Sequence, residues 1–181
     1  LRVPSFAENY TVNGKTFEKG KDVVSVFIKA GEETTVQVSF EVCPVFEKRA
    51  YGLNVVRNGS LLFSLPIKYH TVMKEYERDG VERKFPYCDY EYYPDTDWNY
   101  GFADTALTVE YRGVSDTPFS SVNPPVVIKA NVKKIDWGYA DGYDTVCAKI
   151  PEHTEGIGEA EEKELYPYGC AKLRMTELPL I

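Results

Sequence analysis

Short apolar runs separated by turn residues constrain the fold of this chain more than any other feature of its sequence. Residues 34–42 (TTVQVSFEV) alternate between polar and apolar side chains, which is the two-residue period of a half-buried strand. Asn13-Gly14 and Asn58-Gly59 each separate two such runs, and Asn-Gly favours a two-residue hairpin turn because both residues accept positive φ. Further apolar runs lie at 105–111, 126–135 and 170–176. The pattern predicts an all-β fold, an antiparallel β-sandwich of the jelly-roll type.

The regular pattern fails between residues 68 and 101, where polar and aromatic residues gather. We therefore expect a long, irregular, aromatic-rich insertion there, with at most a turn of helix over residues 73–78. Two further predictions concern single segments. Residues 24–28 (VSVFI) favour a short apolar strand, and the acidic run 159–164 (EAEEKE) favours a solvated linker.

The length of 181 residues suits one domain, because a chain of this size can bury a substantial core. We expect a single β-sandwich over residues 1–181. An alternative division places 1–67 and 160–181 in one sandwich, with 68–159 as an inserted second β subdomain. Leu1 stands where a strand would already be running, so we expect the chain to be a piece of a longer protein.

Charge and cysteine content argue against several partners and compartments. The net charge of -7 repels nucleic-acid phosphates and anionic membrane surfaces, so we expect neither as a partner. No apolar run approaches the ~20 residues that cross a bilayer. The four cysteines are widely spaced without a Cys-x-x-Cys pair, which predicts reduced, mostly buried thiols. The absence of a signal-peptide pattern and of a disulfide framework slightly favours the cytoplasm.

The sequence contains no recognisable catalytic or metal-binding cluster. The two histidines, His70 and His153, are far apart and have no neighbouring metal-ligand pattern. Paired carboxylates could hydrolyse glycosides, but catalysis needs one carboxyl group to be desolvated. The candidate pairs all lie in polar stretches that predict surface acids: Asp95 with Asp97, Glu75 with Glu77, and Asp141 with Asp144. We therefore expect no catalytic residue, no bound metal and no cofactor, with a structural calcium on loop acids as the alternative.

Aromatic residues within 87–102 are the best candidates for a functional surface. The candidate residues are Tyr92, Tyr93, Asp97, Trp98, Asn99 and Tyr100. Tyrosine and tryptophan suit interfaces, because they are large, rigid and able to hydrogen-bond at one end. They could equally stack on sugar rings or simply pack inside the fold. An interface would require them to be exposed, so burial of Trp98 and Tyr100 within the chain would contradict it.

Several segments resemble the C-terminal β-domain of bacterial β-L-arabinofuranosidase-like glycoside hydrolases. They are LRVPSFA at 1–7 with VNG at 12–14, VRNGSLLFSLPI at 56–67, DWNYG at 97–101 and YPYGCAKLRMTELP at 166–179. The segments span the whole chain in the family order. The chain differs at Phe6, where a tryptophan is usual, and at Asn58 and Ser60, where an arginine and a proline are usual.

This resemblance implies a parent enzyme with a six-hairpin α/α-barrel that removes L-arabinofuranose or a related sugar. In such enzymes a zinc-bound cysteine is the nucleophile, and the zinc ligands, including an adjacent Cys-Cys pair, lie in the barrel. No Cys-Cys pair occurs here, so the cysteines of this chain inherit no such role. The expected function is that of a non-catalytic accessory domain that braces the barrel of the same parent chain, with a second copy as a further partner. The alternative is a carbohydrate-binding module for a plant-wall glycan, using Tyr92, Tyr93, Trp98 and Tyr100.

Overall fold

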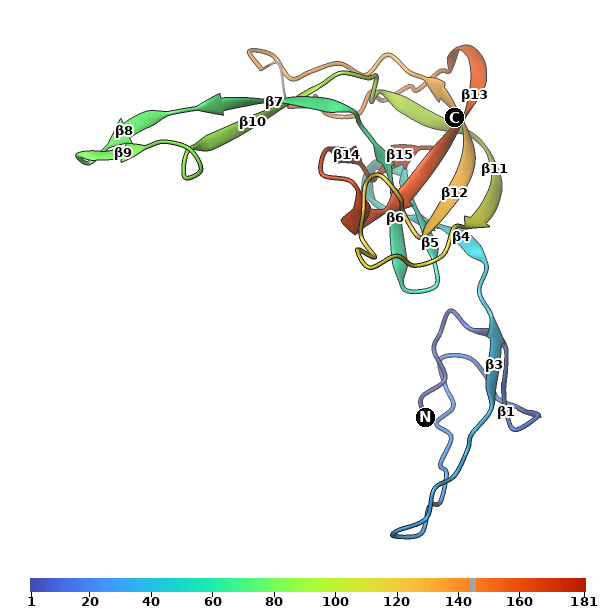
Figure 1. Ribbon diagram of the computed structural model, residues 1–181. Coiled ribbons are helices and arrows are strands. Elements are labelled where there is room, and N and C mark those ends of the chain that lie inside the picture. The colour runs from blue at the N-terminus through green and yellow to red at the C-terminus, as the bar shows by residue number, and fades with distance from the viewer. Residues whose placement is uncertain (144–145) are drawn as a thin grey trace.

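The structure is a computed structural model that describes residues 1–143 and 146–181. Strands make up 49% of it and helix only 3%, so the predicted all-β class is confirmed. Every pair of named strands is antiparallel. Figure 1 shows three parts: an N-terminal lobe (residues 1–42), a central lobe, and a long arm (residues 69–94) that projects from the central lobe.

The N-terminal lobe is a small sheet in the order β2-β1-β3. Its strands are β1 (Glu8–Val12), β2 (Lys15–Thr16) and β3 (Val38–Glu41). The predicted hairpin at Asn13-Gly14 is confirmed, with φ of 48° and 79° at the two turn residues. Val3, Ala7, Tyr10, Val12 and Val24 form the core of this lobe. The lobe therefore has a hydrophobic core of its own, separate from that of the central lobe.

The strand predicted over residues 24–28 is wrong. Only Val24 is buried, and the following residues form no ladder, so the side chain of Phe27 is 85% exposed. The alternating run 34–42 forms a strand only over Val38–Glu41. Both Val38 and Phe40 are exposed, although the Phe40 ring stacks on Tyr10 at 5.7 Å between centroids. The apolar periodicity is present, but the described lobe has no second layer to cover this face.

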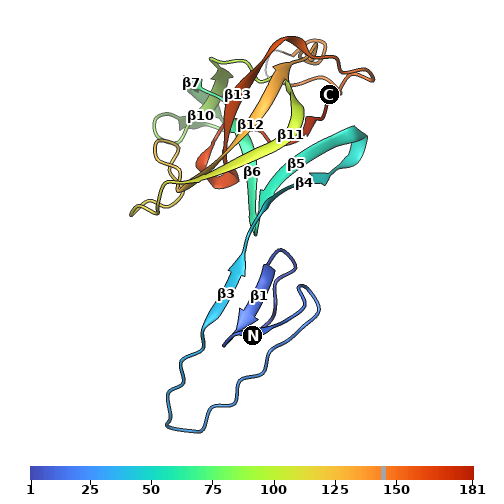
Figure 2. The ribbon, with the colours of Figure 1, turned by 90° about the vertical axis from the view of Figure 1, so that its right-hand side faces the viewer.

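The central lobe is one curled sheet of eight strands. These are β4 (Pro44–Lys48), β5 (Leu53–Asn58), β6 (Leu61–Pro66), β11 (Tyr100–Tyr111), β12 (Val126–Lys134), β13 (Ile157–Pro167), β14 (Arg174–Met175) and β15 (Leu178–Pro179). The order is β11-β12-β13-β6-β5-β15, with β14 on β6 and β4 on β5. A parallel bridge between Phe102 and Leu180 connects β11 to the end of the chain, so the sheet nearly closes on itself (Figure 2). Its interior is filled by residues such as Phe63, Ile128, Val132 and Leu165.

The second predicted hairpin, between β5 and β6, is confirmed with a shift of one residue. Asn58 pairs with Leu61, so the turn residues are Gly59 and Ser60 rather than Asn58 and Gly59. Gly59 has φ of 62°, and a Cβ there would lie 3.1 Å from Val42. This turn therefore packs closely against the end of the N-terminal lobe.

Strand β12 lies between β11 and β13, and β13 in turn pairs with β6. Thus strands from within 68–159 and strands from 1–67 and 160–181 belong to one sheet. The alternative division at residues 67 and 160 does not separate two sheets.

The predicted strand over 170–176 is also shorter than expected, because the 3₁₀ turn η2 (Tyr168–Cys170) precedes the two-residue β14. A second 3₁₀ turn, η1 (Ala50–Gly52), connects β4 to β5.

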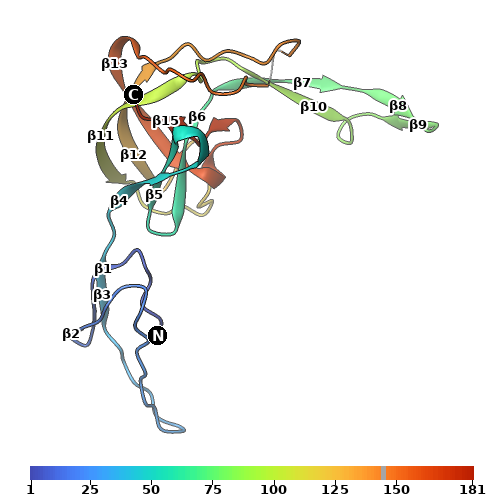
Figure 3. The ribbon, with the colours of Figure 1, turned by 180° about the vertical axis from the view of Figure 1, so that it is seen from behind.

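The arm is regular where the sequence predicts irregular structure. Its strands are β7 (Tyr69–Lys74), β8 (Tyr76–Arg78), β9 (Val81–Arg83) and β10 (Asp89–Pro94). β7 pairs with β10 and β8 with β9, so the arm is a long two-stranded ribbon (Figure 3). The helical turn expected over 73–78 is wrong, because Met73 and Lys74 belong to β7 and the chain then continues into β8.

The acidic run 159–164 is also strand rather than linker, since all of it lies in β13. Its side chains have cationic partners on the sheet surface: Lys129 near Glu162, Lys163 near Glu161, and Arg112 near Glu164.

All four cysteines are free; Cys88 and Cys170 are buried, whereas Cys43 and Cys147 are exposed. No helix in the described part of the chain has the length and apolarity needed to cross a membrane.

Candidate functional site

Two of the six candidate residues from the sequence, Trp98 and Tyr100, lie in the core of the central lobe. They are 8% and 3% exposed, respectively. The indole Nε1 of Trp98 donates a hydrogen bond to the hydroxyl of Tyr139 at 3.0 Å, and its ring meets Trp137 edge-on at 5.6 Å. This burial contradicts the interpretation of Trp98 and Tyr100 as exposed interface or sugar-stacking residues. They anchor the base of the arm instead.

Tyr92 and Tyr93 lie on β10 and, as neighbours in a strand, face opposite sides of the arm. Both are half-buried by local contacts. The Tyr92 ring meets Tyr69 edge-on at 5.1 Å, and the ammonium group of Lys172 lies 4.4 Å from its centroid. The Tyr93 ring stacks on His70 at 5.5 Å, and its hydroxyl donates to Glu91 at 2.7 Å. The structure therefore does not bring the four aromatic candidates together into one platform.

The other two candidates, Asp97 and Asn99, flank Trp98. Asp97 is exposed and forms an ion pair with Lys134. Asn99 donates from Nδ2 to the carbonyl of Ile135 at 2.9 Å, and its own carbonyl accepts from the Ile135 amide at 2.9 Å. Asn99 is thus a structural clamp between the start of β11 and the end of β12.

None of the acidic pairs is desolvated in the described chain. Asp95 bonds to Nδ1 of His70 at 2.7 Å, and Glu75 accepts from the Phe85 amide at 3.1 Å; both carboxylates are exposed. Asp144, the partner proposed for Asp141, lies outside the described residues. The described residues contain no group of three His, Cys, Asp or Glu side chains that could hold a metal ion.

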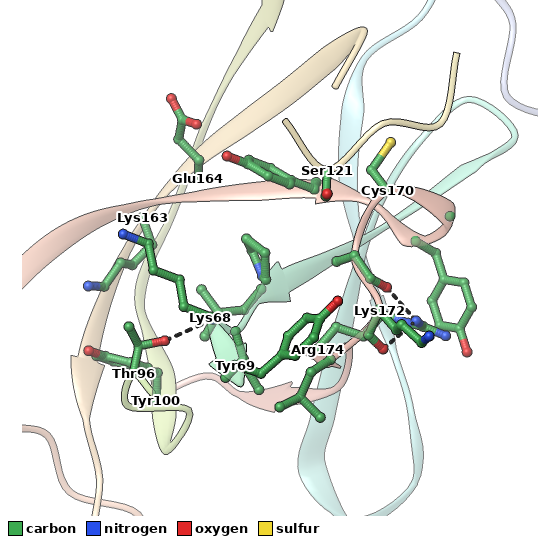
Figure 4. Close-up of a pocket in the computed structure, with 18 of the residues that line it drawn as sticks. Lys68, Tyr69, Thr96, Tyr100, Ser121, Lys163, Glu164, Cys170, Lys172 and Arg174 are labelled. Carbon is green, nitrogen blue, oxygen red and sulfur yellow. Dashed lines mark hydrogen bonds between the residues drawn. The ribbon is translucent and has the colours of Figure 1, made fainter. Parts of the chain in front are cut away.

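A hollow at the base of the arm brings several functional groups together. It has a volume of about 1010 Å³, at the upper limit of the usual range of ligand sites. The end of β6, the start of the arm, the end of β13 and the η2–β14 segment surround it. Lys163, Thr96 and Tyr100 lie toward one end, Lys172 and Arg174 toward the other, and Tyr69 between them (Figure 4). We call it the basal hollow.

The pairing of β14 with β6 builds this hollow. Arg174 pairs with Pro66, which brings the segment 168–174 next to Lys68 and Tyr69 at the start of the arm. The Arg174 guanidinium stacks on the Tyr168 ring at 3.5 Å, and its Nη1 donates to the carbonyls of Ala171 and Lys172. Its conformation is therefore fixed by the backbone of its own loop and by one aromatic ring.

Two tyrosines of the basal hollow remain neutral well above physiological pH. Burial raises the pKa of Tyr100 and Tyr166 above the ordinary value of 10.0, with smaller contributions from Glu161 and Glu164. The Lys163 ammonium lies 5.2 Å from the Tyr100 ring, and a hydrogen bond with Glu161 raises the pKa of Lys163. These groups offer neutral phenols and permanent positive charge rather than an acid–base pair.

A second hollow of about 750 Å³ continues from the first, since both are lined by Thr96, Asp97, Tyr100 and Lys163. The sequence candidates Asp97 and Tyr100 thus do line the concave surface, at its middle. The cations Lys68, Lys172 and Arg174 were not among the candidates. For Lys172 and Arg174 the sequence signal is the alternation of charged and apolar residues in AKLRM at 171–175, and Lys68 lies outside that run.

The basal hollow offers cations, phenols and a hydroxyl group for binding, and among the described residues it holds no nucleophile bonded to a base. The His70–Asp95 pair has the geometry of an oriented imidazole, yet both groups are exposed on the arm. Its nearest described ring partner is Tyr93. No family model matches the chain, and neither the curated proteins nor the solved structures give a match.

Proposed function

We propose that this chain is a non-catalytic accessory region that supports a larger folded body through its arm. The observation that carries the proposal is the arm itself, a two-stranded ribbon with exposed apolar side chains. Isolated two-stranded ribbons are marginally stable in water and gain stability from a third strand or from packing on another surface. Within the described chain, β7–β10 and β8–β9 have no third strand.

The apolar side chains on the arm are numerous for a free surface element. Those exposed are Tyr69, Met73, Tyr76, Val81, Phe85, Tyr87 and Tyr90. Phe85 and Tyr87 are 71% and 82% exposed, although aromatic side chains contribute most when they are buried. Exposed apolar side chains gathered on one element in this way favour a site that another protein surface covers.

The partner that we propose is the α/α-barrel of the same parent polypeptide. The segments that resemble the β-L-arabinofuranosidase-like glycoside hydrolases support this choice. In such an arrangement the arm would lie on the barrel and hold the two parts in a fixed relation. The chemistry would belong to the barrel, and the present chain would supply stability and orientation.

A pair of exposed arm residues tests this proposal. We expect Phe85→Ser with Tyr87→Ser to lower the melting temperature of the full-length gene product by several degrees, because each loses about 1.5–3 kcal/mol of burial. The same double substitution should leave the 181-residue chain unchanged, since both side chains are exposed there. Val122→Ser, at a loop residue that is 91% exposed, is the matched control.

Hydrogen–deuterium exchange of the full-length product and of the 181-residue chain is an independent test of the proposal. Arm amides should exchange more slowly in the full-length product than in the 181-residue chain. Equal exchange in both, or a gene that encodes no helical-repeat region before Leu1, would overturn the proposal.

A further inference from the structure

The basal hollow has a positive charge that the chain as a whole does not have. Lys68, Lys172 and Arg174 line it, and none of them has a carboxylate partner in the part of the chain that the structure describes. Its two acids are already engaged, Asp97 by Lys134 and Glu164 by Arg112. Three unpaired cations therefore converge in a protein with a net charge of -7, where most cations pair with the abundant acids.

The guanidinium of Arg174 is fixed in one conformation and has a nitrogen free to bind an anion. Both hydrogen bonds of Arg174 use Nη1, and the Tyr168 ring fixes the plane of the guanidinium, so Nη2 has no partner among the described residues. Lys172 is positioned in a similar way, because its ammonium group rests against the Tyr92 ring. A guanidinium fixed in one plane binds carboxylates with little further loss of side-chain entropy.

The remaining lining suits a polyhydroxylated ligand. Tyr69 and Tyr168 present partly exposed rings, and Thr96 contributes a hydroxyl oxygen that accepts from the Lys68 amide at 3.1 Å. The basal hollow also continues into the second hollow, so the concave surface is extended rather than round. The neighbouring β14 offers little edge for a peptide strand, because it is only two residues long and already pairs with β6.

From the unpaired cations, the fixed guanidinium and the extended hydroxyl-rich lining, we infer that the basal hollow binds an oligosaccharide that carries carboxylate groups. The cations would pair with the carboxylates, and the tyrosine rings would contact the sugar faces. Apart from Tyr69, which begins the arm and also lines the hollow, the site uses none of the exposed apolar residues of the arm. The cations that define it do not depend on the proposed bracing role.

Titration calorimetry of the folded 181-residue chain tests the inference with a hexamer of galacturonic acid. We expect binding that weakens as salt is added, and no binding of the neutral hexamer maltohexaose. Lys68→Gln and Lys172→Gln should each raise the Kd about tenfold, as expected for the loss of one charge-assisted hydrogen bond. Lys48→Gln, an exposed lysine on β4 with no ion pair in the described chain, removes the same charge far from the hollow and should leave the Kd unchanged.

Three outcomes with the two hexasaccharides and the lysine variants would overturn the inference. These are absence of heat with the acidic hexamer at millimolar concentration, equal binding of maltohexaose, and equal losses for Lys48→Gln and Lys172→Gln. A glutamate hexapeptide tests whether the hollow binds any chain of carboxylates. If it binds as tightly as the galacturonate hexamer, the hollow recognises negative charge alone, and the assignment to an acidic glycan is wrong.

Discussion

At the scale of single residues, Gly101 shows how tightly the end of the chain crosses the central sheet. It lies in β11, next to the parallel bridge that Phe102 makes with Leu180. A Cβ at Gly101 would lie 2.8 Å from Cγ2 of Ile181 and 3.3 Å from Pro179. The absence of a side chain at this position is therefore what allows the sheet to close.

We expect Gly101→Ala to lower the free energy of unfolding by about 1–3 kcal/mol, because the added methyl group must displace packed neighbours. Urea denaturation of the two proteins measures the difference. Gly138→Ala is the matched control, since a Cβ there meets nothing within 4 Å and its φ is not positive. Equal stability of Gly101→Ala and the parent would mean that the C-terminal residues are not seated on β11.

Glu161 connects two charged or polar groups on the same surface, and this makes stability depend on pH. Hydrogen bonds from Lys163 and from Tyr100 hold its pKa below the ordinary value of 4.5. A depressed pKa in the folded state stabilises the fold above the unfolded pKa, and that contribution is lost as the pH falls through the folded pKa.

Glu161→Gln should therefore be less stable than the parent at pH 7, and the difference should shrink as the pH falls below 4.5. The midpoints of urea denaturation at several pH values measure this difference in stability. Glu155→Gln, at an exposed acid without an ion pair in the described chain, should show no such convergence. A difference between Glu161→Gln and the parent that stays constant down to pH 3 would contradict the proposed cause.

At the scale of elements, the sequence predicted the hairpins better than it predicted the other strands. Asn13-Gly14 and the Gly59 turn act locally through positive φ, so their neighbours carry enough information. The strand β13 could not be found in the same way. Its acids become compatible with a sheet only because Lys129 and Arg112, more than 30 residues away, lie beside them.

The arm and the basal hollow also could not be predicted from the local sequence alone. The apolar–polar alternation in β7 and β10 is weak, because the described chain covers neither face of the ribbon completely. The hollow depends on the pairing of Arg174 with Pro66, which are over 100 positions apart. Asp97 and Tyr100 could be found from their local aromatic context, whereas Lys68, Lys172 and Arg174 are brought together only by topology.

At the scale of the whole molecule, the two cores behave as separate units. The core of the N-terminal lobe contains only five buried residues, too few for independent stability in a segment of this size. The larger core draws on β5, β6, β11, β12 and β13 and needs none of residues 1–42. The lobes meet at their junction, where Gly59 approaches Phe6 and Val42 and a hollow is lined by residues of both lobes.

A chain of residues 43–181 should therefore keep a cooperative unfolding transition and its near-ultraviolet circular dichroism, with a melting temperature within several degrees of the parent. A synthetic peptide of residues 1–42 should show little regular structure under the same conditions. Loss of the near-ultraviolet signal in 43–181 would mean that the small lobe is needed for packing of the large one.

The bridge between Phe102 and Leu180 also sets an order of events during protein synthesis. The ring of strands can be completed only after Leu180 has left the ribosome, although β5 and β6 emerge more than 100 residues earlier. The pairing partners of the arm all lie within residues 69–94, so the arm can form while translation continues. We therefore expect the nascent chain to present its apolar ribbon to the surroundings well before the central lobe is able to close.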